Sequence, residues 1–383
     1  MKSEREIIIH RIEIGQPHRG GQTIQTWINN LKAAENAVNT DRRALVNTYH
    51  DISVDGQLTA LVEKRVLSLL NVPITWQGLR DERYIQNLES PWFFDLLQHI
   101  GKSIFEGYSL VELVPGKDGL IDDVNRIPPA NILPFEKLIT CQPYSRSGSV
   151  ISYTLPPENK YVLEVGNPAD LGLYAVLAPY VLMKRSNLAD FARFNEMFGM
   201  PLRWYEYDPN DPTARDKVTE AAKAQGSAAY VVVPKGTKVN FVDAAKTGAS
   251  SYEPFHDLMN REMSIVVLGQ TLTTQQTNVG SQALGEVHQQ VETEIAMKDR
   301  LMAEYLLNYK LKPMLIANGY PLQGVKAQFN LNKELTPAEK LKMWLEMADA
   351  GLPIAKEDLY NEFGVPLPKG RVTLTTKGGE VRK

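Results

Sequence analysis

Residues 268–281 read LGQTLTTQQTNVGS, a polar stretch without lysine, arginine, aspartate or glutamate. Glycines stand near both ends, at Gly269 and Gly280, and glycine permits backbone conformations that other residues avoid. The apolar periodicity of a helix is present on each side of the stretch and absent within it. We therefore expect a flexible, uncharged loop that joins two helices.

Apolar spacing predicts the two helices beside this loop. The helix before it runs from about 250 to 268, and the helix after it from about 281 to 312, where Pro313 would end it. At ~1.5 Å per residue the second helix would span roughly 48 Å, which is long for a globular protein. Its apolar side is formed by Ala283, Val287, Val291 and Ile295.

A further helix is predicted upstream, from about Pro179 to Phe198, with the proline in its first turn and Gly199 after its end. A compact α/β insertion separates it from the helix at 250–268. The insertion has predicted strands at 202–207, 229–233 and 239–242 and a helix at 213–226. A helical stalk that carries a distal cap requires this order of elements.

The rest of the chain predicts an α+β fold. Helices and short strands alternate over 40–176, after an N-terminal segment with a short strand, a glycine turn and a helix. After the long helix come a strand at 325–331, a helix at 336–349, a short helix at 356–363 and a tail that we expect to be mobile.

Composition bounds the classes of function. The 383 residues include 42 Lys+Arg and 45 Asp+Glu, a net charge of −3, which disfavours a basic DNA-coating protein. The single cysteine, Cys141, excludes an intramolecular disulfide and a cysteine-based zinc site. The apolar run at Ile7–Ile9 is too short for a signal peptide, and no run suits a membrane helix. We expect assembly in a reducing cytoplasm.

No catalytic constellation emerges, and we predict neither an enzyme nor a cofactor nor a metal site. The tripeptide Gly101-Lys102-Ser103 lacks the glycine that a phosphate-binding loop needs at position 96, which is Leu96. Cys141 has no neighbouring base, and no histidines are paired at metal-binding spacing. The acids Asp122 and Asp123 fit a solvated loop or a metal ligand pair, which leaves a nucleic-acid-processing subunit as an alternative.

Three motifs carry a family resemblance. They are RSNLADFARFNEMFGMP at 185–201, VPKG at 233–236, and LGQTLTT at 268–274 followed by GSQALGEVH at 280–288. Weaker likeness covers 55–65 and 107–113. With these motifs the chain resembles phage portal proteins, above all the Mu-like portal family, over roughly residues 50–320.

The resemblance implies a portal fold and a ring, usually of twelve subunits, at one capsid vertex. Double-stranded DNA would pass through the ring non-specifically, driven by a terminase. The implied segments are an N-terminal arm (1–39), a wing (40–176), stem helices (177–199 and 247–268), a clip (200–246), a tunnel loop (269–281), a long wing helix (282–312), a wing return with a small C-terminal region (313–363) and a mobile tail (364–383).

The resemblance also nominates site residues. The tunnel loop would present Gln270, Thr271, Thr273, Thr274, Gln275, Gln276, Thr277 and Asn278 to DNA. The clip would present Glu206, Asp208, Asn210 and Asp211 to the terminase large subunit and later to head-completion or neck proteins. A capsid or scaffold protein would surround the ring in the virion. From the residues alone, an ordinary connecting loop, a solvated acidic turn, and a tail or baseplate structural protein remain alternatives.

Overall fold

The computed structural model describes residues 6–36, 40–146, 148–198, 203–224, 230–237, 245–270, 282–330, 337–349 and 360. Contacts divide the chain into a unit that spans Met1–Phe329 and a second unit that spans Asn330–Lys383. In the second unit the predicted helix at 336–349 is present as α11 (Pro337–Asp349), whereas the predicted tail lies outside the described residues.

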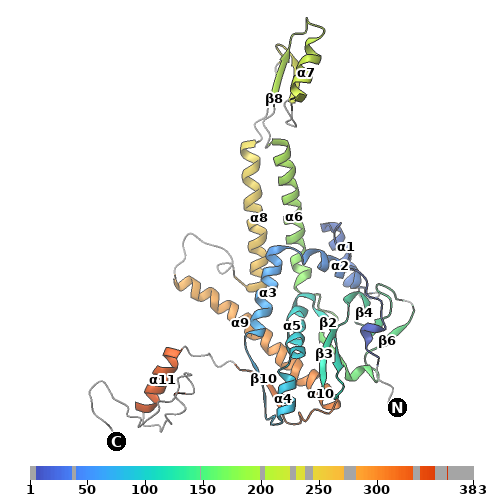
Figure 1. Ribbon diagram of the computed structural model, residues 1–383, viewed down its shortest axis with the longest axis vertical. Helices are drawn as coiled ribbons and strands as arrows, with labels where there is room; N and C mark the ends of the chain where they lie inside the picture. The colour runs from blue at the N-terminus through green and yellow to red at the C-terminus, as the bar shows by residue number, and fades with distance from the viewer. Residues whose placement is uncertain are drawn as a thin grey trace. The chain divides into compact units, whose positions relative to one another are not determined.

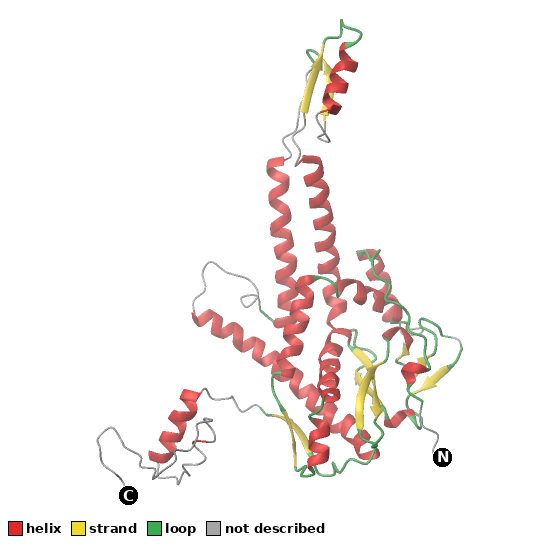
Figure 2. Cartoon of the chain, in the orientation of Figure 1, coloured by secondary structure: helices red, strands yellow, loops and turns green. Residues whose placement is uncertain are grey.

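The N-terminal half of the first unit supplies helices that pack on short antiparallel sheets (Figures 1 and 2). The helices are α1 (Ile24–Ala34), α2 (Arg43–Ile52), α3 (Gly56–Leu70), α4 (Glu82–Leu88) and α5 (Pro91–Glu106). The central sheet has the order β3 (Ile121–Arg126), β2 (Tyr108–Pro115), β7 (Val162–Gly166). A second sheet has the order β4 (Ile132–Leu133), β5 (Leu138–Thr140), β6 (Val150–Ser152), and β1 (Ile74–Gln77) pairs with β10 (Lys326–Phe329).

The central sheet is buried on both faces. Val111 of β2 belongs to a core with α5, whereas Leu110 belongs to a core with the second sheet. The turn from α5 into β2 depends on Gly107, at φ 77°, because a Cβ there would lie 2.0 Å from the carbonyl oxygen of Asp170. This α+β arrangement confirms the predicted mixture of helix and sheet.

The N-terminal segment departs from its prediction. Ile7–Ile9 does not form a strand, and Ile8–His10 is instead a 3₁₀ turn, η1. The amide of Ile8 donates to both carboxylate oxygens of the buried Glu112, at 2.8 and 3.1 Å, rather than to a neighbouring strand. A buried side chain distant in the sequence therefore overrides the local β-propensity of three isoleucines.

The predicted stalk helices lie side by side as α6 (Gly172–Phe198) and α8 (Ala245–Leu268) (Figure 1). Contrary to the prediction, Pro179 lies inside α6 and not in its first turn. Proline cannot donate to the carbonyl four residues earlier, that of Ala175. The indole of Trp27 donates to that oxygen at 3.1 Å, so a side chain from α1 satisfies the group that the proline leaves free.

The insertion between α6 and α8, named here the cap, contains β8 (Arg203–Tyr207), α7 (Ala214–Ala224) and β9 (Tyr230–Pro234). The two strands pair in parallel, with Tyr205 opposite Val232, and α7 contacts both strands. These elements match the predicted ones, and the predicted third strand at 239–242 lies outside the described residues.

The long helix continues beyond its predicted end. It begins as α9 (Gln282–Leu306), passes through a π-helical turn, η4 (Leu307–Leu311), and ends as α10 (Lys312–Ala317). Pro313 lies in the first turn of α10 and does not end the helix, contrary to the prediction. The side chain of Asn308 bonds both backbone groups of Ala327 at 2.9 and 2.8 Å, which fixes the π-helical turn to β10.

Candidate functional site

The lower part of the helix pair is held by buried charged groups from α3 and from the loop before it. The ammonium of Lys184 on α6 donates to Asp55 at 2.7 Å and to Asn260 of α8 at 3.1 Å. Lys184 is buried, and Asp55 is also the N-cap of α3, whose oxygen accepts from the amide of Leu58. One cation therefore joins both helices of the pair to the start of α3.

Arg65 of α3 makes a second buried junction. Its guanidinium binds both carboxylate oxygens of Asp299 on α9, at 2.8 and 3.1 Å, and donates to the carbonyl oxygen of Val267 on α8 at 2.8 Å. This two-pronged geometry is the strongest form of ion pair that side chains make. Arg65 thus links the last turn of α8 to α9, across the segment that joins them.

The residues next to that segment are also fixed. Gly269 has φ 70°, and a Cβ on it would lie 2.8 Å from Cγ1 of Val291. The side-chain amide of Gln270 donates to Glu292 at 3.0 Å, and Lys64 donates to the same carboxylate oxygen at 3.0 Å. Gln270, just after the end of α8, is therefore joined to Glu292 of α9.

The ion pairs of Lys184 with Asp55 and of Arg65 with Asp299 are buried, and burial makes them hard to break. Removing one partner of a buried ion pair leaves a charge without compensation, which typically costs 3–5 kcal/mol. Apolar packing surrounds the charges, because α3, α5, α6 and α8 share one core that includes Leu61, Leu177 and Met263. The arrangement can hold a segment in place; it offers no nucleophile or proton relay.

The structure places the nominated loop residues as follows. Gln270 is only 2 % exposed and bonds Glu292, so it anchors the loop and does not face a channel as predicted. The remaining seven lie outside the described residues: Thr271, Thr273, Thr274, Gln275, Gln276, Thr277 and Asn278.

The nominated cap residues lie on β8 and on the turn that follows it, and all are exposed: Glu206, Asp208, Asn210 and Asp211. Two of the carboxylates build the turn. Asp208 accepts from the amide of Asn210 at 2.9 Å, and Asp211 accepts from the amide and the hydroxyl of Thr213 at 2.8 and 2.9 Å. The Thr213 amide, followed by its hydroxyl, lowers the pKa of Asp211.

The residues considered for catalysis have structural surroundings. Gly101-Lys102-Ser103 lies within α5, where the Ser103 hydroxyl donates to the carbonyl oxygen of Ile100 at 2.6 Å. Asp122 and Asp123 lie exposed on β3. In the part of the chain that the structure describes, no three or more His, Cys, Asp or Glu side chains gather as a metal site would require. No helix among the described residues is both long and apolar enough to cross a membrane.

Comparison with known proteins gives consistent matches. The family described as the portal protein of Mu bacteriophage matches residues 46–365. The portal protein of Escherichia phage Mu is 29 % identical over 223 residues, which cover 55 % of this chain and 43 % of that protein. The Mu-like prophage FluMu protein gp29 of Haemophilus influenzae is 27 % identical over 212 residues, which cover 53 % of this chain and 41 % of that protein.

A chain in the solved virion of a native gene transfer agent particle has the same fold at 12 % identity, with a TM-score of 0.51 over 92 % of this chain and 96 % of that chain. The fold and the matched region define a phage portal protein, a structural and not an enzymatic class. The chain belongs to the family of portal proteins of Mu bacteriophage. The matched part spans less than half the length of the two curated relatives.

Proposed function

We propose that this chain is the subunit of a portal ring, expected to contain twelve copies, through which double-stranded DNA enters and leaves a phage-like particle. Membership of the Mu portal family supports this proposal, as does the shared fold with a chain of a virion. In this assignment α6 and α8 form the stem, the cap is the clip, and residues 271–281 form the tunnel loop.

One observation carries the proposal: the uncharged stretch 271–281 begins directly after Gln270, a residue that a hydrogen bond fixes to α9. Arg65 ties α8 to α9, and Gln270 ties the start of the loop to Glu292. A loop whose start is fixed in this way can present its side chains at a defined height in a ring. Its neutrality suits passage, because every phosphate that a protein neutralises adds affinity and would slow the DNA.

An exposed apolar stripe on α9 and η4 supports assembly with further copies. Met297, Leu301, Tyr305 and Tyr309 follow one another at four-residue spacing, and each is between 50 % and 74 % exposed. Their exposed area is on the order of 500 Å², against roughly 800 Å² per partner in a standard interface. A stripe of this size is unfavourable in water, and the neighbouring copy in a ring would cover it.

The other partners follow from the place of the portal in a particle. The exposed acids at Glu206, Asp208 and Asp211 would dock the terminase large subunit during packaging and neck proteins afterwards. A capsid or scaffold protein would surround the ring, which would assemble in the host cytoplasm and remain in the virion.

The test begins with the mass of the purified protein and a low-resolution image of it. We expect closed rings with an axial opening wide enough for duplex DNA. Deletion of 272–279 should leave the rings intact and reduce packaged genome length or rate, and a glycine–serine replacement of the same length separates loop length from side-chain chemistry. A protein without rings, or full packaging by the deletion variant, would contradict the proposal.

A further inference from the structure

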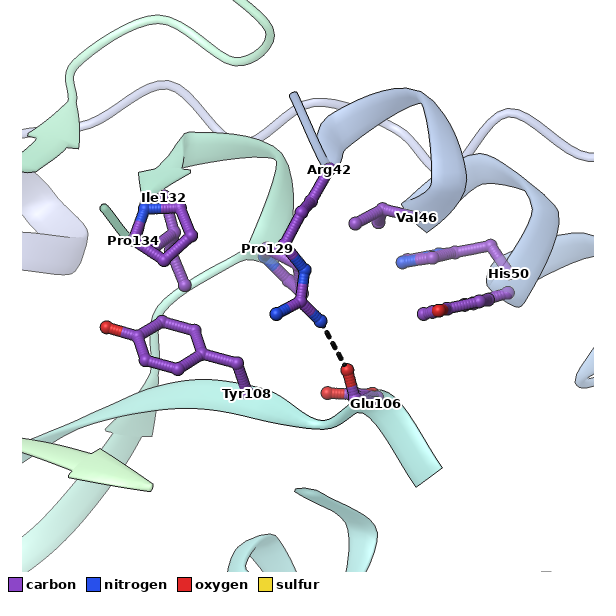
Figure 3. Close-up of a pocket in the computed structure, with 9 residues that line it drawn as sticks. Arg42, Val46, His50, Glu106, Tyr108, Pro129, Ile132 and Pro134 are labelled. Atoms are coloured by element: carbon purple, nitrogen blue, oxygen red, sulfur yellow. Dashed lines mark hydrogen bonds between the residues drawn. The ribbon is translucent and has the colours of Figure 1, made fainter. Parts of the chain in front are cut away.

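Two pockets adjoin each other beside α2 and the end of α5, where both are lined by Tyr49, His50 and Glu106, and they differ in what they can hold. The smaller, drawn in Figure 3, has a volume of about 30 Å³, room for about one water molecule. The guanidinium of Arg42 donates there to the carbonyl oxygens of Glu106 and Pro168, at 2.7 and 2.8 Å. Arg42 therefore joins the backbone at the end of α5 to the backbone at Pro168, and its guanidinium is not available to a ligand.

The larger pocket has a volume of about 280 Å³ and collects cations from three separate segments. Arg19 comes from the segment before α1, Lys102 from α5 and Arg126 from the end of β3. Two carboxylates, of Glu63 and Glu106, also line it. Cationic side chains therefore outnumber anionic ones in a concave site formed by residues far apart in the sequence.

Several hydrogen-bond donors of the larger pocket have acceptors for none or only some of their N–H and O–H groups. Lys102 is half-buried, and the structure gives its ammonium no hydrogen bond or ion pair among the described residues. The hydroxyl of Tyr174 likewise has no hydrogen-bond partner among the described residues. Arg126 pairs with Glu106, and Arg19 donates one N–H to the carbonyl oxygen of His50 at 2.6 Å, which leaves further N–H groups of both arginines for another acceptor.

The pKa values of two neighbouring histidines, His50 and His99, are lowered in part by the same cations. Burial, then Arg126 and Arg19, lower the pKa of His50. Burial, then Arg126 and Lys102, lower the pKa of His99, whose Nδ1 is buried without a partner. Both rings are therefore neutral at pH 7 and do not add to the charge, so the three permanent cations define what the pocket attracts.

We propose that this pocket binds a phosphate group through Lys102, Arg126 and Arg19. Arginine matches two phosphate oxygens with its planar fork, and lysine adds a compact charge, so the set suits a dianion or a phosphodiester. The volume accommodates a phosphate with part of its hydration shell. The group can come from free phosphate or from a nucleic-acid backbone, and the site is independent of the channel function proposed above.

The test measures inorganic phosphate binding to the full-length protein at low ionic strength, by calorimetry or by ³¹P line broadening. We expect saturable binding with a Kd on the order of millimolar. Lys102→Met, which keeps the length of the side chain, should weaken binding by at least about tenfold, because a charge-assisted bond is lost. Glu63→Gln, which removes a negative charge, should tighten it a few-fold.

The control is Lys117→Met, which removes an equal charge at an exposed position outside the pocket and should leave binding unchanged. Competition by a short oligonucleotide would identify the source as nucleic acid, and its absence would identify free phosphate. The proposal is overturned if phosphate does not saturate up to about 20 mM, a level that excludes millimolar affinity, or if the Lys102 and Lys117 variants bind equally well.

Discussion

The base of the helix pair and the cap, two parts of one chain, are stabilised in opposite ways. At the base, Arg65 and Asp299 are buried together and bridge three helices. In the cap, Ala222 is the single buried side chain among those described in 204–224 and 230–237. Among the residues that the structure describes, its sheet consists of β8 and β9, and a two-stranded sheet is marginal in water.

Among the described residues, the base is held by buried bonds within one chain, whereas the cap has little core of its own. Both cap strands have an outer edge that no described strand covers, and open edges invite pairing with another chain. In the proposed ring the base would hold the loop at a fixed place, which favours buried ion pairs, whereas the cap would meet other molecules, which favours exposed edges and charges.

The largest effect is expected from Arg65→Met at the base. The change leaves Asp299 buried without a cation and the Val267 carbonyl oxygen without its donor, so the free energy of unfolding should fall by about 3–5 kcal/mol. Urea denaturation followed by circular dichroism measures it. The double change Arg65→Met with Asp299→Leu should recover much of the loss, because an apolar pair can replace a buried ion pair.

The matched control is Arg83→Met, because Arg83 pairs with Asp118 at 3.2 Å but both side chains are more than half exposed. We expect a loss below about 1 kcal/mol there. Equal losses from Arg65→Met and Arg83→Met would mean that the base is no better stabilised than the surface.

A smaller effect is expected from Gly269→Ala at the start of the loop. The new Cβ would lie 2.8 Å from Val291 and the residue would need φ 70°, so the free energy of unfolding should fall by about 1–3 kcal/mol. Adding Val291→Ala removes the clash but not the strained φ, and should restore part of the loss relative to Val291→Ala alone. Additive losses measured by urea denaturation would show that the two residues do not touch.

Hydrogen exchange compares the two regions directly. Backbone amides of β8 and β9 should exchange at least about tenfold more slowly in assembled rings than in the separated subunit, because partners would cover the open edges. Amides of α3, which lies within the core of one chain, should exchange at the same rate in both forms. Equal protection of the cap in both forms would show that it is complete without a partner.

The sequence predicted most of the scaffold because apolar spacing and turn residues act locally. The paired helices, the cap elements and the start of α11 follow from such signals. Proline positions were less informative: Pro179 lies inside α6 because Trp27, far away in the sequence, satisfies the freed carbonyl oxygen. A contact between residues so far apart in the sequence produces no periodic pattern of apolar residues from which it could be predicted.

The buried ion pairs were also missed, although a signal exists. Arg65 follows Leu61 and Val62 on the apolar side of α3, at the spacing where a buried residue is expected. A charge at such a position indicates a buried partner, but Asp299 is more than two hundred residues away, and no local pattern pairs them. Gln270 was assigned to the channel from the family resemblance, which does not distinguish an exposed side-chain amide from a buried one.

The smallest effect concerns the turn of the cap, where order comes from side chain to backbone bonds and not from a core. Thr213→Val removes the hydroxyl that donates to Asp211 but keeps the amide, so the lowered pKa of Asp211 should rise part of the way toward 3.8. Because the pKa of Asp211 is depressed in the folded chain, these bonds stabilise the turn at a pH above the pKa of the unfolded chain. The stabilisation is lost as the pH falls through the pKa of the folded chain.

Carboxylate NMR shifts follow the titration of Asp211. Asp118, whose pKa is lowered chiefly by the Leu120 amide, serves as the internal control, and its pKa should not change. If the pKa of Asp211 stays where it was, the hydroxyl contributes nothing, and the cap turn owes its order to the bonds that the carboxylates accept from backbone amides.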